Sequence, residues 1–242
     1  MYYYILEAPP TRAARQTYQK LRDLLTQLSI AGEMVVASPA RNPAELADMG
    51  IEKGYSTIVA VGGDFHVNEV ATAILGRAVL GVIPIGASQL VTDIIGLTGI
   101  KEAALALKQR RLSSQSTVLV EPDTIIFLDS VIRAPRIAKV SMILDNRVRA
   151  HAYFNKITIN RFLEIRLESE HITEKRKVLG LFSVGGETIH SESLFHAKSA
   201  RILIDPPMMA TIAGEDVAKT PIQLRLLPDS LKVITKRGTI LE

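Results

Sequence analysis

Two consecutive strand–glycine–helix segments constrain this chain more than any other feature of its sequence. Residues 58–61 read IVAV and run into Gly62-Gly63-Asp64, and residues 78–85 read AVLGVIPI and run into Gly86. Short apolar runs rich in β-branched residues are typical of strands buried on both faces of a parallel sheet. In such sheets, ligands bind over the carboxyl ends of the strands, where glycine turns let backbone amides approach a phosphate. The two segments therefore predict a phosphate-binding crevice.

The residues that follow these glycines do not suit such a crevice. Phe65-His66 follows the first turn, and residues 87–90, Ala-Ser-Gln-Leu, follow the second, where a working cradle favours glycine and small polar residues. A phenyl ring cannot share backbone space that a phosphate must approach, and glycine also gives access to positive φ angles. We therefore expect Phe65 to fill the phosphate space with apolar surface.

Alternating strand and helix patterns extend from the start of the chain to about Arg111. Tyr2–Leu6 reads as a strand, Thr11 suits a helix N-cap, and Asn42-Pro43 with Glu45 forms a second helix start. This βαβ order predicts an α/β domain over residues 1–112, with a doubly wound, mostly parallel sheet.

After Arg111 the pattern changes to short β-rich runs. Leu112–Ser116 reads as a polar linker, and turn signals such as Asp145-Asn146 separate the runs that follow it. Apolar and polar residues alternate in Val148–Phe154, as expected for antiparallel strands with one solvated face. The pattern predicts an all-β sandwich domain over residues 113–242.

Composition narrows the range of chemistry and partners. The 242 residues allow one or two domains, and the absence of cysteine excludes disulfides and thiolate chemistry. The net charge of +4 is too small to imply nucleic acid by itself, and its short basic clusters favour solvated surfaces or a weak attraction to anionic lipid headgroups. The N-terminus lacks the pattern of a signal peptide, so we expect a cytoplasmic protein without a nucleic-acid partner and with at most peripheral membrane contact.

Three segments, in order along the chain, resemble the catalytic family of the diacylglycerol kinases, relatives of the NAD kinases and sphingosine kinases. Residues 59–75 resemble its Gly-Gly-Asp-Gly-Thr-x-Asn-Glu segment, residues 80–96 resemble its Ile-Pro-x-Gly-Thr-x-Asn-Asp segment, and residues 198–234 resemble its closing pattern of strands, Pro pair and Asp-Gly-Glu turn. The resemblance implies an α/β domain followed by a β-sandwich, with the last strand returning to the first domain. It also implies ATP and Mg²⁺ as cofactors and a lipid hydroxyl as acceptor.

The resemblance also implies a set of site residues. Asp64 would be a catalytic residue and the metal ligand, and Glu215 would lie near the position of the base. The nucleotide-binding positions would be Gly62, Gly63, Asn68, Glu69, Gly86 and Ser88.

The chain departs from the family pattern in three loops. Phe65 and His66 replace the glycine and threonine of the first loop, and Ala213 replaces the aspartate of the third turn. In the second loop, Ala87, Gln89 and Leu90 replace threonine, asparagine and aspartate of the family pattern. Outside these three loops, Glu7-Ala8-Pro9-Pro10 stands where the family has an Asn-Pro turn near the N-terminus. Phosphoryl transfer depends on positioning and on charge stabilisation, so three altered loops favour loss or great reduction of kinase activity. In that case the protein would need no cofactor.

Two other hypotheses stay open at this point. The protein is alternatively an active ATP- and Mg-dependent lipid kinase, or an enzyme of another class that uses Asp64, His66 and Glu69 as a metal or acid–base cluster. Structural roles compete with these: His66 would hydrogen-bond the start of the helix, and Asp64 would be the N-cap of a helix over residues 67–75. The ligand would be a nucleotide or a lipid, and an exposed strand would permit a homodimer.

Overall fold

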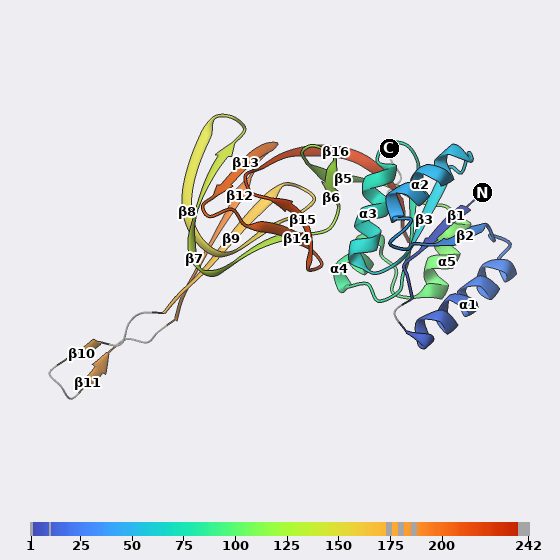
Figure 1. The fold of residues 1–242 in the computed structure, drawn as a ribbon, viewed down its shortest axis with the longest axis horizontal. Helices are drawn as coiled ribbons and strands as arrows, with labels where there is room; N and C mark the ends of the chain where they lie inside the picture. Colours follow the sequence, from blue (N-terminus) through green and yellow to red (C-terminus); the bar gives the residue numbers. More distant parts are fainter. Residues whose placement is uncertain (1, 10, 173–175, 179–181, 185–187, 237–242) are drawn as a thin grey trace. The chain divides into compact units, whose positions relative to one another are not determined.

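The computed structural model describes residues 2–9, 11–172, 176–178, 182–184 and 188–236. Within it the chain forms two compact units (Figure 1). The first contains residues 1–117 together with 227–242, and the second contains residues 118–226. The predicted order of an α/β part followed by a β-rich part is confirmed.

The first unit is built on parallel strands. Its strands are β1 (Tyr2–Leu6), β2 (Glu33–Val36), β3 (Thr57–Gly62) and β4 (Val79–Pro84), which pair in the order β4-β3-β1-β2. All three of these pairings are parallel. Every residue of β3 is buried, as its apolar β-branched sequence predicts. The strand β16 (Ile222–Ile234) adds a parallel pairing to β4 at Val233–Leu80, so the end of the chain returns to this unit.

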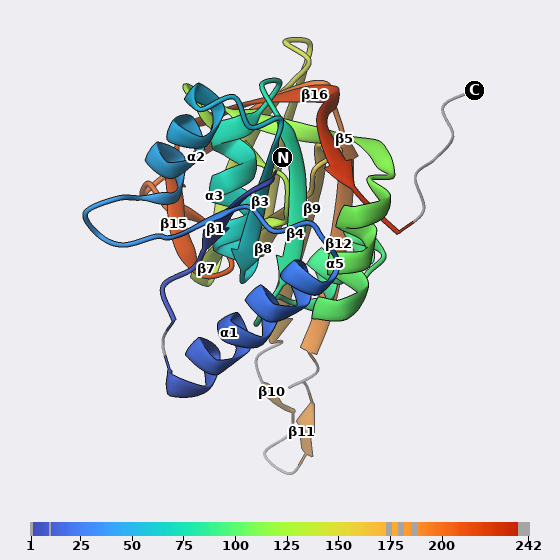
Figure 2. The same cartoon turned by 90° about the vertical axis from the view of Figure 1, so that its right-hand side faces the viewer.

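Helices connect these strands and cover the sheet. They are α1 (Arg12–Gln27), α2 (Pro43–Glu52), α3 (Asp64–Ile74), α4 (Gln89–Ile95) and α5 (Ile100–Gln109). The two predicted caps are confirmed, since the Thr11 side chain accepts from the Ala14 amide and the Asn42 side chain accepts from the Glu45 amide. Helix α2 packs beside α3, and α1 packs beside α5 (Figure 2).

The second unit is antiparallel. Its strands are β6 (Thr124–Ile126), β7 (Ser130–Leu144), β8 (Val148–Ile159), β9 (Glu164–Ile172), β10 (Arg176–Val178), β11 (Phe182–Val184), β12 (Thr188–His196), β13 (Ser199–Ile204), β14 (Met209–Ile212) and β15 (Glu215–Lys219). The order β12-β9-β8-β7-β13 continues to the first half of β16, and β14 pairs with β7 and β15. The chain thus combines parallel pairing in one unit with antiparallel pairing in the other.

Two expectations about local structure are wrong. Leu112–Ser116 is not a linker but the start of β5 (Leu112–Val120), which pairs with β16 and buries Ser113. The β-rich run Thr158–Leu167 reads as a single strand but is not one, because Asn160 turns the chain by accepting from the amides of Phe162 and Glu164. A neighbouring strand decides the structure in the first place and side-chain hydrogen bonds decide it in the second, and local apolar patterning reveals neither partner.

Candidate phosphate crevice

The two glycine turns lie next to each other at the carboxyl edge of the first unit's sheet. Gly62 of β3 is paired with Pro84 of β4, and the Ile85 amide donates to the Gly62 carbonyl at 3.1 Å. Helix α3 begins directly after the first turn, with Gly63 as its N-cap, and α4 begins after the second, with Ser88 as its N-cap. Because the strands are parallel neighbours, both turns and both helix starts share one edge, as the sequence predicts.

A carboxylate from a third strand occupies the first turn. Glu7 follows β1, the neighbour of β3, and its Oε2 accepts from the Gly63 amide at 2.7 Å. A Cβ placed on Gly62 would lie 2.6 Å from that same oxygen, so the carboxylate packs directly against the glycine turn. The amide that a glycine turn offers to an anion is therefore already bound to an anion of the chain itself.

The Asp64 carboxylate joins the two turns. Its Oδ1 accepts from the Ser88 amide at 2.6 Å, and its Oδ2 accepts from the Ser88 hydroxyl at 2.5 Å. Asp64 is the first residue of α3 and not its N-cap, which is Gly63 with no side-chain cap bond. The capping role suggested for Asp64 is therefore wrong, and its carboxylate instead links residues that lie 24 positions apart.

His66 lies in the first turn of α3, but its side chain points into the protein. Its exposed fraction is 3%, and its Nε2 lies 2.9 Å from the carbonyl oxygen of Ile5 in β1. Because a carbonyl only accepts, this bond requires a proton on Nε2. Burial lowers the pKa of His66 below its ordinary value, although the Ile5 carbonyl and the Glu7 charge oppose that shift. The predicted bond to the start of the helix is wrong, because a neighbouring strand supplies the partner.

The other predicted nucleotide-binding positions lie around the same edge. Asn68 is buried on α3, and the next residue, Glu69, is half-buried. Each of these two residues interacts with another part of the protein. Gly86 has a φ of +75°, the left-handed conformation that glycine adopts without strain. Phe65 is half-buried beside them. The structure therefore brings Gly62, Gly63, Asp64, Gly86 and Ser88 to one place, as predicted.

Glu215 belongs to the second unit. It is the exposed first residue of β15 and follows a turn in which Ala213 and Gly214 have φ angles of +52° and +91°. This is the position at which the resemblance implies a catalytic turn. The role of Glu215 beside Asp64 stays a prediction, since the two residues lie in different units.

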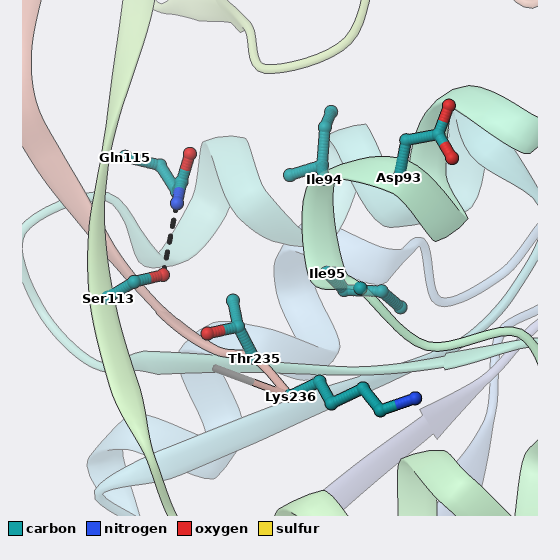
Figure 3. Close-up of a pocket in the computed structure, with 8 residues that line it drawn as sticks. Asp93, Ile94, Ile95, Ser113, Gln115, Thr235 and Lys236 are labelled. Atoms are coloured by element: carbon teal, nitrogen blue, oxygen red, sulfur yellow. Dashed lines mark hydrogen bonds between the residues drawn. The ribbon is translucent and has the colours of Figure 1, made fainter. Parts of the chain in front are cut away.

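A separate pocket lies at the other end of α4. It has a volume of about 440 Å³ and is lined by the end of α4, by Ser113 and Gln115 of β5, and by Thr235 and Lys236 after β16 (Figure 3). Gln115 donates to the Ser113 hydroxyl at 3.0 Å. Its lining includes none of the predicted site residues, so it is distinct from the phosphate crevice.

Two kinds of feature are absent from the residues that the structure describes. In that part of the chain, no group of three or more histidine or acidic side chains is arranged to hold a metal ion. Nor does any helix there have the length and apolar character to cross a membrane. The proposed cluster of Asp64, His66 and Glu69 is therefore not a metal site in this structure, because His66 is turned toward β1.

Sequence reasoning missed the role of Glu7. The signal was available, because Glu7 directly follows the Tyr2–Leu6 strand and so lies at the same carboxyl edge as the two glycine turns. A carboxylate at that edge is unusual for a site that should attract phosphate, since it carries the same charge as the ligand.

Comparison with known proteins agrees with this geometry. Residues 8–120 match the family model of the diacylglycerol kinase catalytic domain. No curated protein sequence matches the chain. A diacylglycerol kinase from Bacillus anthracis str. Sterne has a similar structure, with a TM-score of 0.68, 15% identity and coverage of 98% of both chains.

Two kinases of nicotinamide dinucleotides have the same fold. An NAD kinase from Archaeoglobus fulgidus, in complex with ATP, gives a TM-score of 0.56 at 11% identity and covers 98% of this chain and 94% of its own. A yeast NADH kinase complexed with NADH gives 0.57 at 9% identity, with 99% and 84% covered. Identities this low establish the fold alone. The family match over residues 8–120 and the shared fold confirm the resemblance of this chain to the diacylglycerol kinase catalytic domain.

Proposed function

We propose that this protein is a lipid-kinase-like protein in which the phosphate crevice is closed by the chain's own carboxylates, so that kinase activity is lost or greatly reduced. The bond from the Gly63 amide to the Glu7 carboxylate, at 2.7 Å, is the observation that carries this proposal. In a working cradle that amide would donate to a phosphate oxygen. Here a nucleotide phosphate would have to displace a fixed negative charge and would meet its repulsion.

The state of Asp64 supports the same proposal. A magnesium ligand needs carboxylate oxygens that are open to the ion, and Mg²⁺ demands near-ideal octahedral geometry. Both oxygens of Asp64 already accept hydrogen bonds from Ser88, and no metal-binding group of three acidic or histidine side chains exists among the described residues. The residues at the crevice therefore do not fit a Mg²⁺ site as they stand.

The sequence changes point in the same direction. Phe65 supplies a half-buried aromatic ring at the first turn, and Ala213 stands at the turn where the family resemblance implies an aspartate. Alanine can neither ligate a metal nor accept a proton. We infer that the crevice holds a ligand other than Mg·ATP, or none, and that the protein acts through binding rather than through phosphoryl transfer.

The alternative is an active ATP- and Mg-dependent lipid kinase with a remodelled cradle. One observation favours it: Gly62, Gly63 and Asp64 keep their place at the carboxyl edge of β3, in a fold shared with an NAD kinase that was solved in complex with ATP. In this reading, Glu7 and Ser88 would release Gly63 and Asp64 when Mg·ATP binds, and Glu215 would act as base from the second unit.

The deciding experiment combines ligand binding with turnover. Thermal unfolding is measured with and without Mg²⁺ and ATP, ADP or NAD, and ATP turnover is measured with lipid and diol acceptors. A ligand present at a hundred times its dissociation constant adds about 2.7 kcal/mol of stability. The proposal predicts no Mg-dependent shift with ATP and no turnover. Turnover that is abolished by Asp64→Asn would overturn it and establish the alternative.

We also propose three further features, which concern the domains, the compartment and the oligomeric state. The predicted α/β domain, with a doubly wound sheet, corresponds to the unit of residues 1–117 and 227–242, and the predicted β-sandwich domain corresponds to the unit of residues 118–226. The protein acts in the cytoplasm. A homodimer formed through an exposed strand of the second domain remains a prediction, and analytical ultracentrifugation tests it.

A further inference from the structure

The second unit carries an open, positively charged sheet face. Along β7, Val140, Met142 and Leu144 are buried, and the alternate residues Lys139, Ser141 and Ile143 face outward. The neighbouring strands follow the same alternation, with Ala200 and Ile202 of β13 and Leu224 of β16 buried beneath them. The outer face of β8, β7, β13 and β16 is therefore available to solvent.

Strand register gathers four cations on this face. Arg149 of β8 and Arg201 of β13 are both paired with Ile143, so the two guanidinium groups flank one side chain. Arg225 of β16 is paired with Ser199, the residue two positions before Arg201, and Lys139 of β7 is paired with Tyr153. All four cations are exposed, and none of them makes an ion pair or a side-chain hydrogen bond with another described residue.

Among the residues that the structure describes, the carboxylates nearest to this face lie at its border. Asp145 is in the turn before β8, where its carboxylate accepts from the amides of Lys198 and Ser199 at 2.8 Å. Asp205 follows β13 and lines a shallow pocket of about 450 Å³ together with Lys139. Neither carboxylate forms an ion pair with a described cation, so the four basic side chains outnumber the two carboxylates at their border.

The same face also exposes an aromatic ring. Tyr153 is 66% exposed although it stands in the middle of β8, directly opposite Lys139. Tyrosine is enriched at membrane interfaces, where its ring lies at the level of the lipid headgroups, and clustered lysine and arginine bind anionic leaflets.

We propose that this face, defined by Lys139, Arg149, Arg201, Arg225 and Tyr153, docks the protein onto an anionic lipid bilayer. A nucleic acid is the less suitable partner, because sheets that bind single strands stack successive bases on several aromatic side chains, and the described outer face of these strands offers one tyrosine. A membrane surface needs no specific shape complementarity, so an open sheet with unpaired cations and an exposed tyrosine ring can bind it. The proposal does not depend on whether the crevice binds ATP.

The test is binding of the full chain to vesicles of phosphatidylcholine with about a third phosphatidylglycerol, compared with pure phosphatidylcholine. The variant R149Q/R201Q/R225Q removes three exposed cations. Each cation close to an anionic leaflet strengthens binding about fivefold, so we expect a loss on the order of a hundredfold. The variant R149K/R201K/R225K keeps the charge and should bind like the natural protein.

A matched control removes the same charge elsewhere. R12Q/R15Q/R22Q neutralises three exposed arginines of α1 in the first unit and lowers the net charge equally. The proposal expects this variant to keep most of the vesicle affinity, and expects Tyr153→Ser to weaken binding severalfold without changing the unfolding temperature. No preference for anionic vesicles, an equal loss in the α1 control, or tight binding to single-stranded nucleic acid in place of vesicles would each overturn it.

Discussion

The contact between Glu7 and Gly63 gives the sharpest prediction, because its loss should affect stability and ligand binding in opposite directions. Glu7→Gln keeps the shape of the side chain and removes its charge. A hydrogen bond to a charged group contributes about 1 kcal/mol more than a neutral one, and a negative charge at a helix start adds about 0.5 kcal/mol through the helix dipole. We therefore expect the free energy of unfolding to fall by about 1.5 kcal/mol, which lowers Tm by about 3–6 °C.

The same substitution should raise the affinity for nucleotide phosphate. A phosphate oxygen seated on the Gly63 amide would lie roughly 4 Å from the Glu7 carboxylate, where two unit charges repel by about 4 kcal/mol at an effective dielectric constant of 20. Removing the charge should strengthen ATP binding at least tenfold, and up to about a thousandfold. Phe65→Gly in the same chain should add to this gain by opening space at the turn.

Calorimetric titration of ATP into the natural protein and the variants measures this effect directly. Glu52→Gln is the matched control, since it removes one exposed carboxylate from the last residue of α2, at the opposite end of that helix from its start. The substitution His66→Thr, which the sequence alone would suggest as a partner for Phe65→Gly, is unsuitable because His66 is buried against Ile5. Tight Mg·ATP binding by the natural protein, or an unchanged affinity after Glu7→Gln, would refute the reasoning.

Three further predictions concern stability. The pKa of His66 is lowered in the folded protein, so the unfolded chain binds more protons below about pH 6.5. We expect the free energy of unfolding to be highest above about pH 6.5 and to fall below it by up to about 1.4 kcal/mol per pH unit. Urea titrations of His66→Gln should lack this slope. Asn42→Ala removes the hydrogen bond that the Asn42 side chain accepts from the Glu45 amide at 2.8 Å. The free energy of unfolding should fall by about 1 kcal/mol, seen as a Tm decrease of about 2–4 °C. Asn42→Asp should be nearly neutral. Gly81→Ala would place a Cβ 2.6 Å from the Leu107 side chain and 3.0 Å from the Val59 side chain. It should lower the free energy of unfolding, measured by chemical denaturation, by about 1–3 kcal/mol. Gly99→Ala, where the space is open, should cost less.

The sequence by itself determined the local elements and the class of the fold. The cap at Thr11 and the Asn42-Pro43 helix start follow from residues within a few positions of one another. Parallel β3 and β4 follow from their apolar β-branched character, because strands covered on both faces have no polar side to show. The glycine turns then had to share one edge of the sheet, so Gly62, Gly63 and Asp64 were predicted as a cluster.

Only the tertiary structure decided what that cluster holds. Glu7 reaches Gly63 across 56 positions, Asp64 reaches Ser88 across 24, and His66 reaches Ile5 across 61. No local spacing encodes such bonds, since each depends on which strands become neighbours and on the direction in which a side chain leaves the edge. Leu112–Ser116 makes the same point: its polar residues read as a linker, and pairing with β16 turned them into a strand. Local patterns fix elements through short-range geometry, whereas the chemistry of this crevice arises from contacts that exist only after the sheet has formed.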